Sequence, residues 1–168
     1  MTLSNKKQPK PFGAVFLIFL IIFQSVSALF GGIVLILGPQ GNLLKMPVSS
    51  LEYSPFHNFL IPGLILFIVL GLFPAFAAFC LIFHPGKKWV NSLNIYHDRH
   101  CGWTYSLYTG LMLMIWITMQ IALIGYGDFI HTLYALIGIL ITVITLVPNV
   151  MNYYHKEDEP ETGIWRTL

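Results

Sequence analysis

The chain has 168 residues, of which 56% are hydrophobic and only 10% are charged. Soluble domains usually contain about 25% charged residues, so this composition excludes a soluble protein and indicates one compact domain solvated mainly by lipid. The formal net charge of +2 gives no basis for a nucleic-acid partner.

Four apolar segments contain no Asp, Glu, Lys or Arg, and each is long enough to cross a bilayer as a helix. The predicted spans lie at about 13–37, 58–84, 104–124 and 132–151. They form a transmembrane domain over 13–151, between a polar N-terminal segment at 1–12 and a tail at 152–168. The first span also resembles a signal peptide with a cleavage site after Ala28. We expect an uncleaved span, because the apolar run continues through FGGIVLIL.

The second span and its two flanking connections carry further structural signals. Pro74, in the middle of this span, should kink the helix and free the carbonyl group of Leu70. The loop at 38–57 has apolar residues that should lie back on the membrane surface or cap the bundle, namely Leu43, Leu44, Met46 and Leu51. After the span, helical spacing of Trp89, Val90, Leu93 and Tyr96 predicts a short helix lying in the membrane interface.

Lys and Arg residues near the span ends predict the orientation, since cytoplasmic loops are enriched in them. One side would hold Lys6, Lys7, Lys10, Lys87, Lys88, Arg99, Lys156 and Arg166, and the other would hold Lys45 alone. Both termini are therefore predicted to be cytoplasmic, with the loops at 38–57 and 125–131 outside. The predicted fold is an all-α membrane protein: an antiparallel four-helix transmembrane bundle with a short interfacial helix on the cytoplasmic side.

Small and weakly polar residues mark the helix faces that should pack together. Lipid is as apolar as leucine, so the hydrophobic effect does not bring apolar helix faces together in a membrane. The clearest stripe follows the fourth span at spacings of three and four residues. The predicted packing residues are Gly31, Gly71, Gly110, Ala135, Gly138 and Asn149. Packing seams are the favoured interpretation of these stripes.

A second interpretation is a cavity between the helices that holds a lipid, a quinone or another small ligand. Its candidate lining residues are Gln24, Trp116, Gln120, Thr142 and Thr145. A side-chain amide in hydrocarbon needs hydrogen-bond partners. The default expectation is that the two glutamines bond each other or a threonine hydroxyl, and a ligand is the alternative.

Several histidines could bind a metal or cofactor. His97, His100 and Cys101 lie in the loop segment HDRHC, where two histidines three residues apart can share a helical face and a thiolate could be a third ligand. The spacing matches no established zinc pattern, so contact with lipid headgroups is favoured. His57 and His131 both precede predicted spans on the outer side and could ligate haem, although helix capping is the favoured role.

Catalytic signatures are absent from the sequence: it has no Walker loop, HExxH, GxSxG or CxxC. Proton-coupled transporters and pumps generally carry an ionisable residue within a span, and these spans contain no Asp, Glu, Lys or Arg. We therefore expect a protein that is not an enzyme and needs no cofactor. A small oligomeric channel lined by threonine and asparagine stripes is a further alternative.

The segment at 28–73 carries a pattern of GG, PxG, LxMP, SPF and a PG that opens the next span, and a Trp and a Gln follow later in LMLMIWITMQIALIG. This pattern resembles a group of small, uncharacterised four-span integral membrane proteins of bacteria. The resemblance implies a four-span bundle in the bacterial cytoplasmic (inner) membrane and no particular activity. In that group an acidic or amide residue often precedes PxG, where this chain has Gly38.

The outer loop would be the most distinctive part of that group. Ser54 is expected to cap, Pro55 to start the turn and Phe56 to anchor at the membrane surface, which makes a fixed re-entry turn. A lid over the outer mouth of the bundle is the alternative. The leading functional prediction is a non-enzymatic structural or accessory protein that contacts membrane lipids and self-associates or joins a larger membrane complex.

Overall fold

The computed structural model describes residues 9–46, 48–52, 54–85, 88–125 and 129–156, and of residues 88 and 89 it describes the backbone alone. The regular elements of these residues are helices. The first, third and fourth long helices are α1 (Phe12–Leu37), α4 (Cys101–Ile124) and α5 (Phe129–Leu146), and the second is continuous over α2 (Leu60–Phe67), the π-helix η3 (Ile68–Leu72) and α3 (Phe73–Phe83). The short elements are the 3-10 turns η1 (Asn42–Leu44), η2 (Val48–Leu51) and η4 (Lys88–Asn91), and the helix α6 (Pro148–Tyr153).

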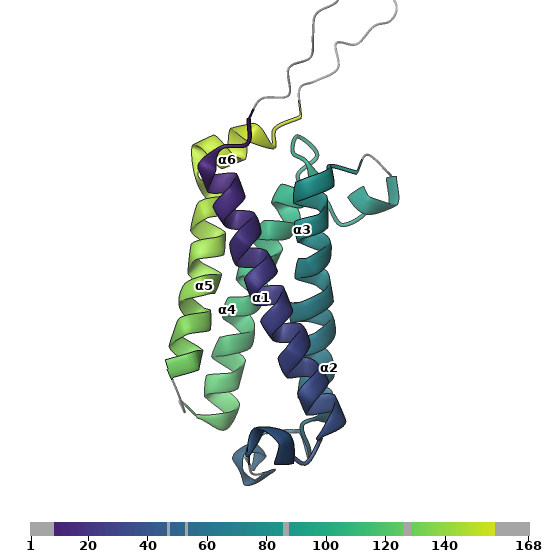
Figure 1. The fold of residues 1–168 in the computed structure, drawn as a ribbon, viewed down its shortest axis with the longest axis vertical. Coiled ribbons are helices and arrows are strands. Elements are labelled where there is room, and N and C mark those ends of the chain that lie inside the picture. Colours follow the sequence, from purple (N-terminus) through teal and green to yellow (C-terminus); the bar gives the residue numbers. More distant parts are fainter. Residues whose placement is uncertain (1–8, 47, 53, 86–87, 126–128, 157–168) are drawn as a thin grey trace, which may run out of the picture.

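Within the described residues, four helices are long and apolar enough to cross a membrane, as the sequence predicts: Phe12–Leu37, Leu60–Phe83, Cys101–Ile124 and Phe129–Leu146. The fourth ends earlier than expected because Pro148 has no N–H to continue the helix and Val147 is extended, with φ −60° and ψ 130°. Residues 148–153 form the separate helix α6, which turns across the end of α5 in Figure 1.

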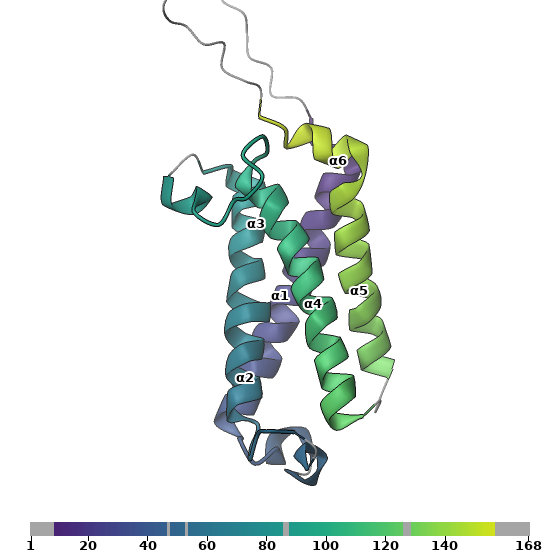
Figure 2. The same ribbon diagram turned by 180° about the vertical axis from the view of Figure 1, so that it is seen from behind.

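The four long helices lie side by side around a shared core (Figures 1 and 2). α1 packs against α2, η3 and α3 on one side and against α5 on the other, while α4 packs against α3 and α5. Both ends of the described chain lie with α6 at one end of the molecule, which we call the α6 end. The turns η1 and η2 lie at the opposite end, which we call the loop end (Figure 1).

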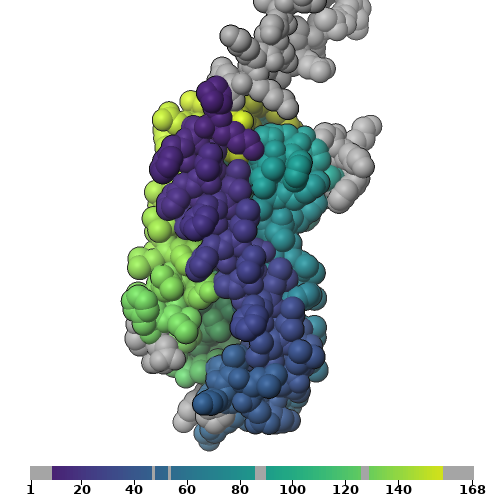
Figure 3. All heavy atoms as spheres, viewed as in Figure 1, coloured from purple at the N-terminus to yellow at the C-terminus, as the bar shows by residue number. Residues whose placement is uncertain are grey.

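Large apolar side chains cover the outer surface of these helices. The residues of α1 form a continuous band across the face seen in Figure 3, and this band carries a row of stacked, exposed phenylalanines: Phe12, Phe16, Phe19 and Phe23. Exposed apolar residues also occur on the second span, α4 and α5. A surface this apolar is typical of helices that are solvated by lipid.

The second span is interrupted by the π-helix η3, which ends two residues before Pro74. Proline has no N–H for the carbonyl of Leu70, and that carbonyl instead accepts a hydrogen bond from Nε2 of Gln24 at 3.0 Å. The carbonyl of Gly71 accepts one from Oγ of Ser25 at 2.8 Å. Two polar side chains of α1 therefore satisfy backbone carbonyls of the second span. One of them is the Leu70 carbonyl, which the sequence predicted Pro74 to leave without its helical donor.

Glycines allow two helix pairs to approach each other closely. A Cβ on Gly32 of α1 would lie 2.8 Å from the backbone nitrogen of Phe67, and a Cβ on Gly110 of α4 would lie 2.9 Å from the carbonyl oxygen of Gly138 on α5. At the predicted packing residue Gly31, the nearest atom is the flexible end of the Leu66 side chain, at 3.2 Å. The backbone contact on α1 is thus made by the neighbouring glycine.

The remaining predicted packing residues have different positions. Gly71 of η3 lies against Leu29, where a Cβ would approach a side-chain atom to 2.6 Å. Ala135 is partly buried against the core. Asn149 is exposed on α6, since the turn at Pro148 takes it off the stripe that α5 presents to the bundle.

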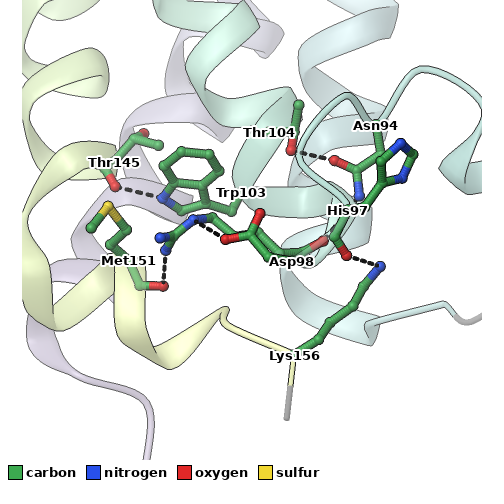
Figure 4. A network of polar contacts seen from close by, with 9 residues as sticks. Asn94, His97, Asp98, Trp103, Thr104, Thr145, Met151 and Lys156 are labelled. Atoms are coloured by element: carbon green, nitrogen blue, oxygen red, sulfur yellow. Dashed lines mark hydrogen bonds and ion pairs between the residues drawn. The ribbon is translucent and has the colours of Figure 1, made fainter. Parts of the chain in front are cut away.

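The connection between α3 and α4 contains one 3-10 turn, η4, followed by turns, where the sequence predicted a short interfacial helix. Asn94 organises this connection and is buried. Its Nδ2 donates to the carbonyl of Arg99 at 2.9 Å, and its Oδ1 accepts from the hydroxyl of Thr104 (Figure 4). The Asn94 side chain thus ties this connection to a backbone carbonyl and to a hydroxyl of α4.

Candidate functional site

Two adjoining cavities lie toward the loop end. The larger has a volume of about 380 Å³ and is bounded by α1, α2 and α4 and by the loop between α1 and α2. The smaller, of about 270 Å³, is bounded by α1, α4 and α5, with one residue each from α2 and from the loop. The two share the lining residues Gly31, Leu44, Leu66, Trp116 and Gln120. The volume of the larger cavity is in the range that small-molecule sites occupy.

The loop at 38–59 closes the larger cavity at the loop end. Its apolar lining residues are Leu44, Met46, Leu51, Phe56 and Phe59. Hydrogen bonds fix the loop: Phe59 N donates to the carbonyl of Pro39 at 2.9 Å, and the Phe56 N–H donates to Oγ of Ser54 at 3.2 Å. Gly41 has φ +75°, and a Cβ there would lie 2.0 Å from the carbonyl oxygen of Met46. The loop is thus both a fixed turn and a cover over the cavity.

Gln24 is the most deeply buried polar residue of the smaller cavity, with 1% of its surface exposed. Its Nε2 donates to the carbonyl of Leu70, so the amide oxygen Oε1 must point the other way. This Oε1 is buried and has no hydrogen-bond partner in the part of the chain that the structure describes. A buried acceptor without a donor is costly and rare in proteins, which makes Oε1 the clearest chemical feature of the site.

Three of the five predicted ligand-binding residues come together at this site. Gln24, Trp116 and Gln120 line the smaller cavity, and the latter two line the larger one as well. The expected mutual bond of the two glutamines is not what satisfies Gln24, since its donor is used by a backbone carbonyl of the second span. Amides within apolar runs were the signal that identified this site.

Thr142 and Thr145 lie elsewhere and bond their own helix. Thr142 donates to the carbonyl of Gly138 at 2.9 Å, and Thr145 donates to that of Ile141 at 2.7 Å. The carbonyl of Thr145 accepts a hydrogen bond from Nε1 of Trp103 at 2.7 Å (Figure 4). These threonines line neither cavity and serve the packing of α5 against α4.

His131 and Tyr134 complete the polar part of the smaller cavity, where Ser27 also contributes. From the sequence, His131 was of interest because it could ligate haem together with His57. In the structure His57 is exposed. Tyr134 had no signal of its own. It lies three residues after His131, on the same face of α5, and this helical spacing connects the two.

The HDRHC segment lies at the α6 end, far along the bundle from the cavities. His97 is exposed, and its carbonyl accepts from Nζ of Lys156 at 3.2 Å (Figure 4). His100 caps α4, with Nδ1 accepting from the Gly102 N–H at 3.2 Å. Cys101 is the buried first residue of α4, with Sγ 3.8 Å from both ring nitrogens of His100. The described residues include no group of three or more His, Cys, Asp or Glu that could hold a metal ion.

Basic side chains at the α6 end bind backbone carbonyls. Lys10 Nζ lies 3.3 Å from the carbonyl oxygen of Leu81, near the end of α3, and Arg99 Nη1 donates to that of Met151 at 2.8 Å. The Arg99 guanidinium also lies 4.9 Å from the ring centre of Trp103. Lys45, the basic residue of the loop between α1 and α2, lies at the opposite end.

Comparisons of the chain with protein-family models, with curated proteins and with solved structures found no match.

Proposed function

We propose that this chain is a multi-pass protein of the bacterial cytoplasmic membrane that binds a lipid, a quinone or another apolar molecule between its helices. In this proposal the helices form an antiparallel transmembrane bundle with both termini in the cytoplasm. The positions of Lys10, Arg99 and Lys156 at the α6 end support that orientation, since cytoplasmic ends carry more Lys and Arg.

The observation that carries the binding proposal is the pair of adjoining cavities with a small set of polar groups. The larger cavity is almost wholly apolar, and Gln24 and Gln120 bring amide groups to the smaller one. An apolar chamber with a few convergent polar atoms is the usual form of a small-molecule site. Because the chamber lies within helices that are themselves apolar, its ligand would come from the bilayer.

The experiment is to purify the protein in a non-ionic detergent and identify the co-purifying small molecules by mass spectrometry. Gly31→Leu is the test variant, because Gly31 lines both cavities and a leucine side chain would fill the space between them. Thr118→Leu is the matched control, since Thr118 is exposed on α4 outside both cavities. We expect a stoichiometric apolar molecule in the wild type and in Thr118→Leu, and its loss in Gly31→Leu.

Equal amounts of the molecule in all three proteins would contradict the proposal, because it would then be bound elsewhere. The absence of any such molecule from the folded wild type, together with no uptake of added membrane lipid or quinone, would contradict it as well.

A non-enzymatic accessory role, within a homo-oligomer or a larger membrane complex, is the second candidate. The observation that favours it is the row of stacked phenylalanines on α1, of which Phe12 and Phe19 are the most exposed. Such a row could meet another transmembrane helix as readily as lipid. Cross-linking in native membranes, with a cysteine at Phe19 and a control cysteine at Ile115 on α4, would test it: a cross-link at Phe19 alone supports this role.

A further inference from the structure

We infer that the ligand of the cavities is an apolar molecule whose head group carries a hydroxyl, and that this hydroxyl donates a hydrogen bond to Oε1 of Gln24. The inference rests on the proposed function and adds the chemical class of the head group. An alkyl phenol, a quinol or a long-chain alcohol has the required donor. A quinone, an ether or a hydrocarbon lacks it.

The argument begins with the direction of the Gln24 amide. The Leu70 carbonyl can only accept, so the NH₂ group of Gln24 must face it, as the 3.0 Å contact shows. Rotating the amide by half a turn would place two acceptor oxygens against each other. Gln24 lines the smaller cavity, and the polar atom of its side chain that the Leu70 carbonyl leaves unbonded is an acceptor, which binds donors alone.

The neighbouring hydroxyls of α1 cannot supply that donor. Ser25 Oγ donates its proton to the carbonyl of Gly71 at 2.8 Å, and Ser27 Oγ donates its proton to the backbone carbonyl of Gln24 at 2.9 Å. A hydroxyl has a single proton, so both are already used. Oε1 is left as a buried acceptor without a partner among the described residues, and a bound molecule could supply its donor.

The cavities provide a place for the rest of such a molecule. A head group on Gln24 would lie in the smaller cavity, beside Trp116 and Gln120, which also line the larger one. The larger cavity is apolar and is covered by Leu51 and Phe56 of the loop, so it suits an alkyl or isoprenoid chain. One amphiphilic molecule could thus occupy both, with its hydroxyl at the α1 side.

The test compares two ligands that differ only in the donor: 4-octylphenol and its methyl ether, 4-octylanisole. Both keep the ring, the chain and the oxygen atom, but the ether has no O–H. Dissociation constants are measured for the full chain in non-ionic detergent by displacement of radiolabelled 4-octylphenol, with Gly31→Leu as the correction for partition into micelles. We expect the phenol to bind on the order of tenfold more tightly than the ether, the usual effect of supplying a donor to a buried acceptor.

Two variants separate the acceptor from the packing of α1. Gln24→Met removes Oε1 and should bring the phenol and the ether to equal affinity. Ser25→Ala removes the neighbouring hydrogen bond to the second span but keeps Oε1, and should keep the tenfold preference. If Gln24→Met does not fold, the phenol-to-ether ratio of the wild type and of Ser25→Ala still decides the matter.

Equal affinity of the wild type for phenol and ether would overturn this inference, because a buried water would then serve Oε1, while the proposed function would stand. A preference that survives in Gln24→Met would overturn it too. Binding of neither compound would remove both the inference and the proposed function.

Discussion

Replacing Gly32 by alanine should force α1 away from the second span. The new Cβ would lie 2.8 Å from the backbone nitrogen and the Cβ of Phe67 and 2.9 Å from its Cα. These atoms belong to or adjoin a helix backbone and cannot rotate away. Overpacking of this kind costs about 1–3 kcal/mol, and the higher helix propensity of alanine returns roughly 1 kcal/mol. We expect a net loss of unfolding free energy of up to about 2 kcal/mol.

Gly31→Ala is the matched control, one residue earlier on the same helix. Its Cβ would meet only Cδ2 of Leu66, at 3.2 Å, and a leucine side chain can shift by a few tenths of an ångström. The gain in helix propensity should leave the unfolding free energy unchanged or raise it by up to about 1 kcal/mol. Because Gly31 lines both cavities, this variant should instead weaken binding of the ligand.

The assay is reversible unfolding in mixed micelles, with the mole fraction of SDS raised and helicity followed by circular dichroism. Gly32→Ala should unfold at a lower SDS fraction than the wild type, and Gly31→Ala at the same fraction or a higher one. The reasoning is refuted if the two variants unfold together, because the contact between Gly32 and Phe67 would then not limit the distance between the helices.

Three further predictions use the same unfolding assay. Gly110→Ala should lose about 1–3 kcal/mol, because its Cβ would meet the hydroxyl oxygen of Thr142, and wild-type stability would contradict the α4–α5 contact. Trp103→Phe should lose about 1–3 kcal/mol, since the buried carbonyl of Thr145 would lose its donor; a loss no larger than that of an exposed substitution would be inconsistent with this bond. Burial, and to a smaller extent the adjacent Tyr153, raises the pKa of the Tyr154 hydroxyl. The contribution of this hydroxyl to stability is therefore complete below the pKa of an unfolded tyrosine, about 10, and declines as the pH rises above that value. Tyr154→Phe should therefore lose less stability than the wild type between pH 9 and about pH 11, and equal slopes would show that Tyr154 does not contribute.

The candidate site was partly accessible from the sequence because amides are conspicuous in apolar segments. Gln24 and Gln120 needed partners in hydrocarbon, and this requirement pointed to the cavity that they do line. The threonines predicted for the same site, Thr142 and Thr145, line neither cavity. A hydroxyl can bond the carbonyl four residues earlier in its own helix, as Thr142 and Thr145 both do, so its polarity says little about what it faces.

The sequence by itself determined the four long apolar helices, since a chain segment of that length without charge can satisfy its backbone in lipid only as a helix. It also determined that Pro74 would leave the Leu70 carbonyl without its usual donor. Tertiary structure decided which group would replace that donor, and the choice of Gln24 left its Oε1 without a partner among the described residues. It also decided that Gly32, rather than Gly31, meets a backbone, because that depends on how neighbouring helices are rotated and not on the residues of either helix alone.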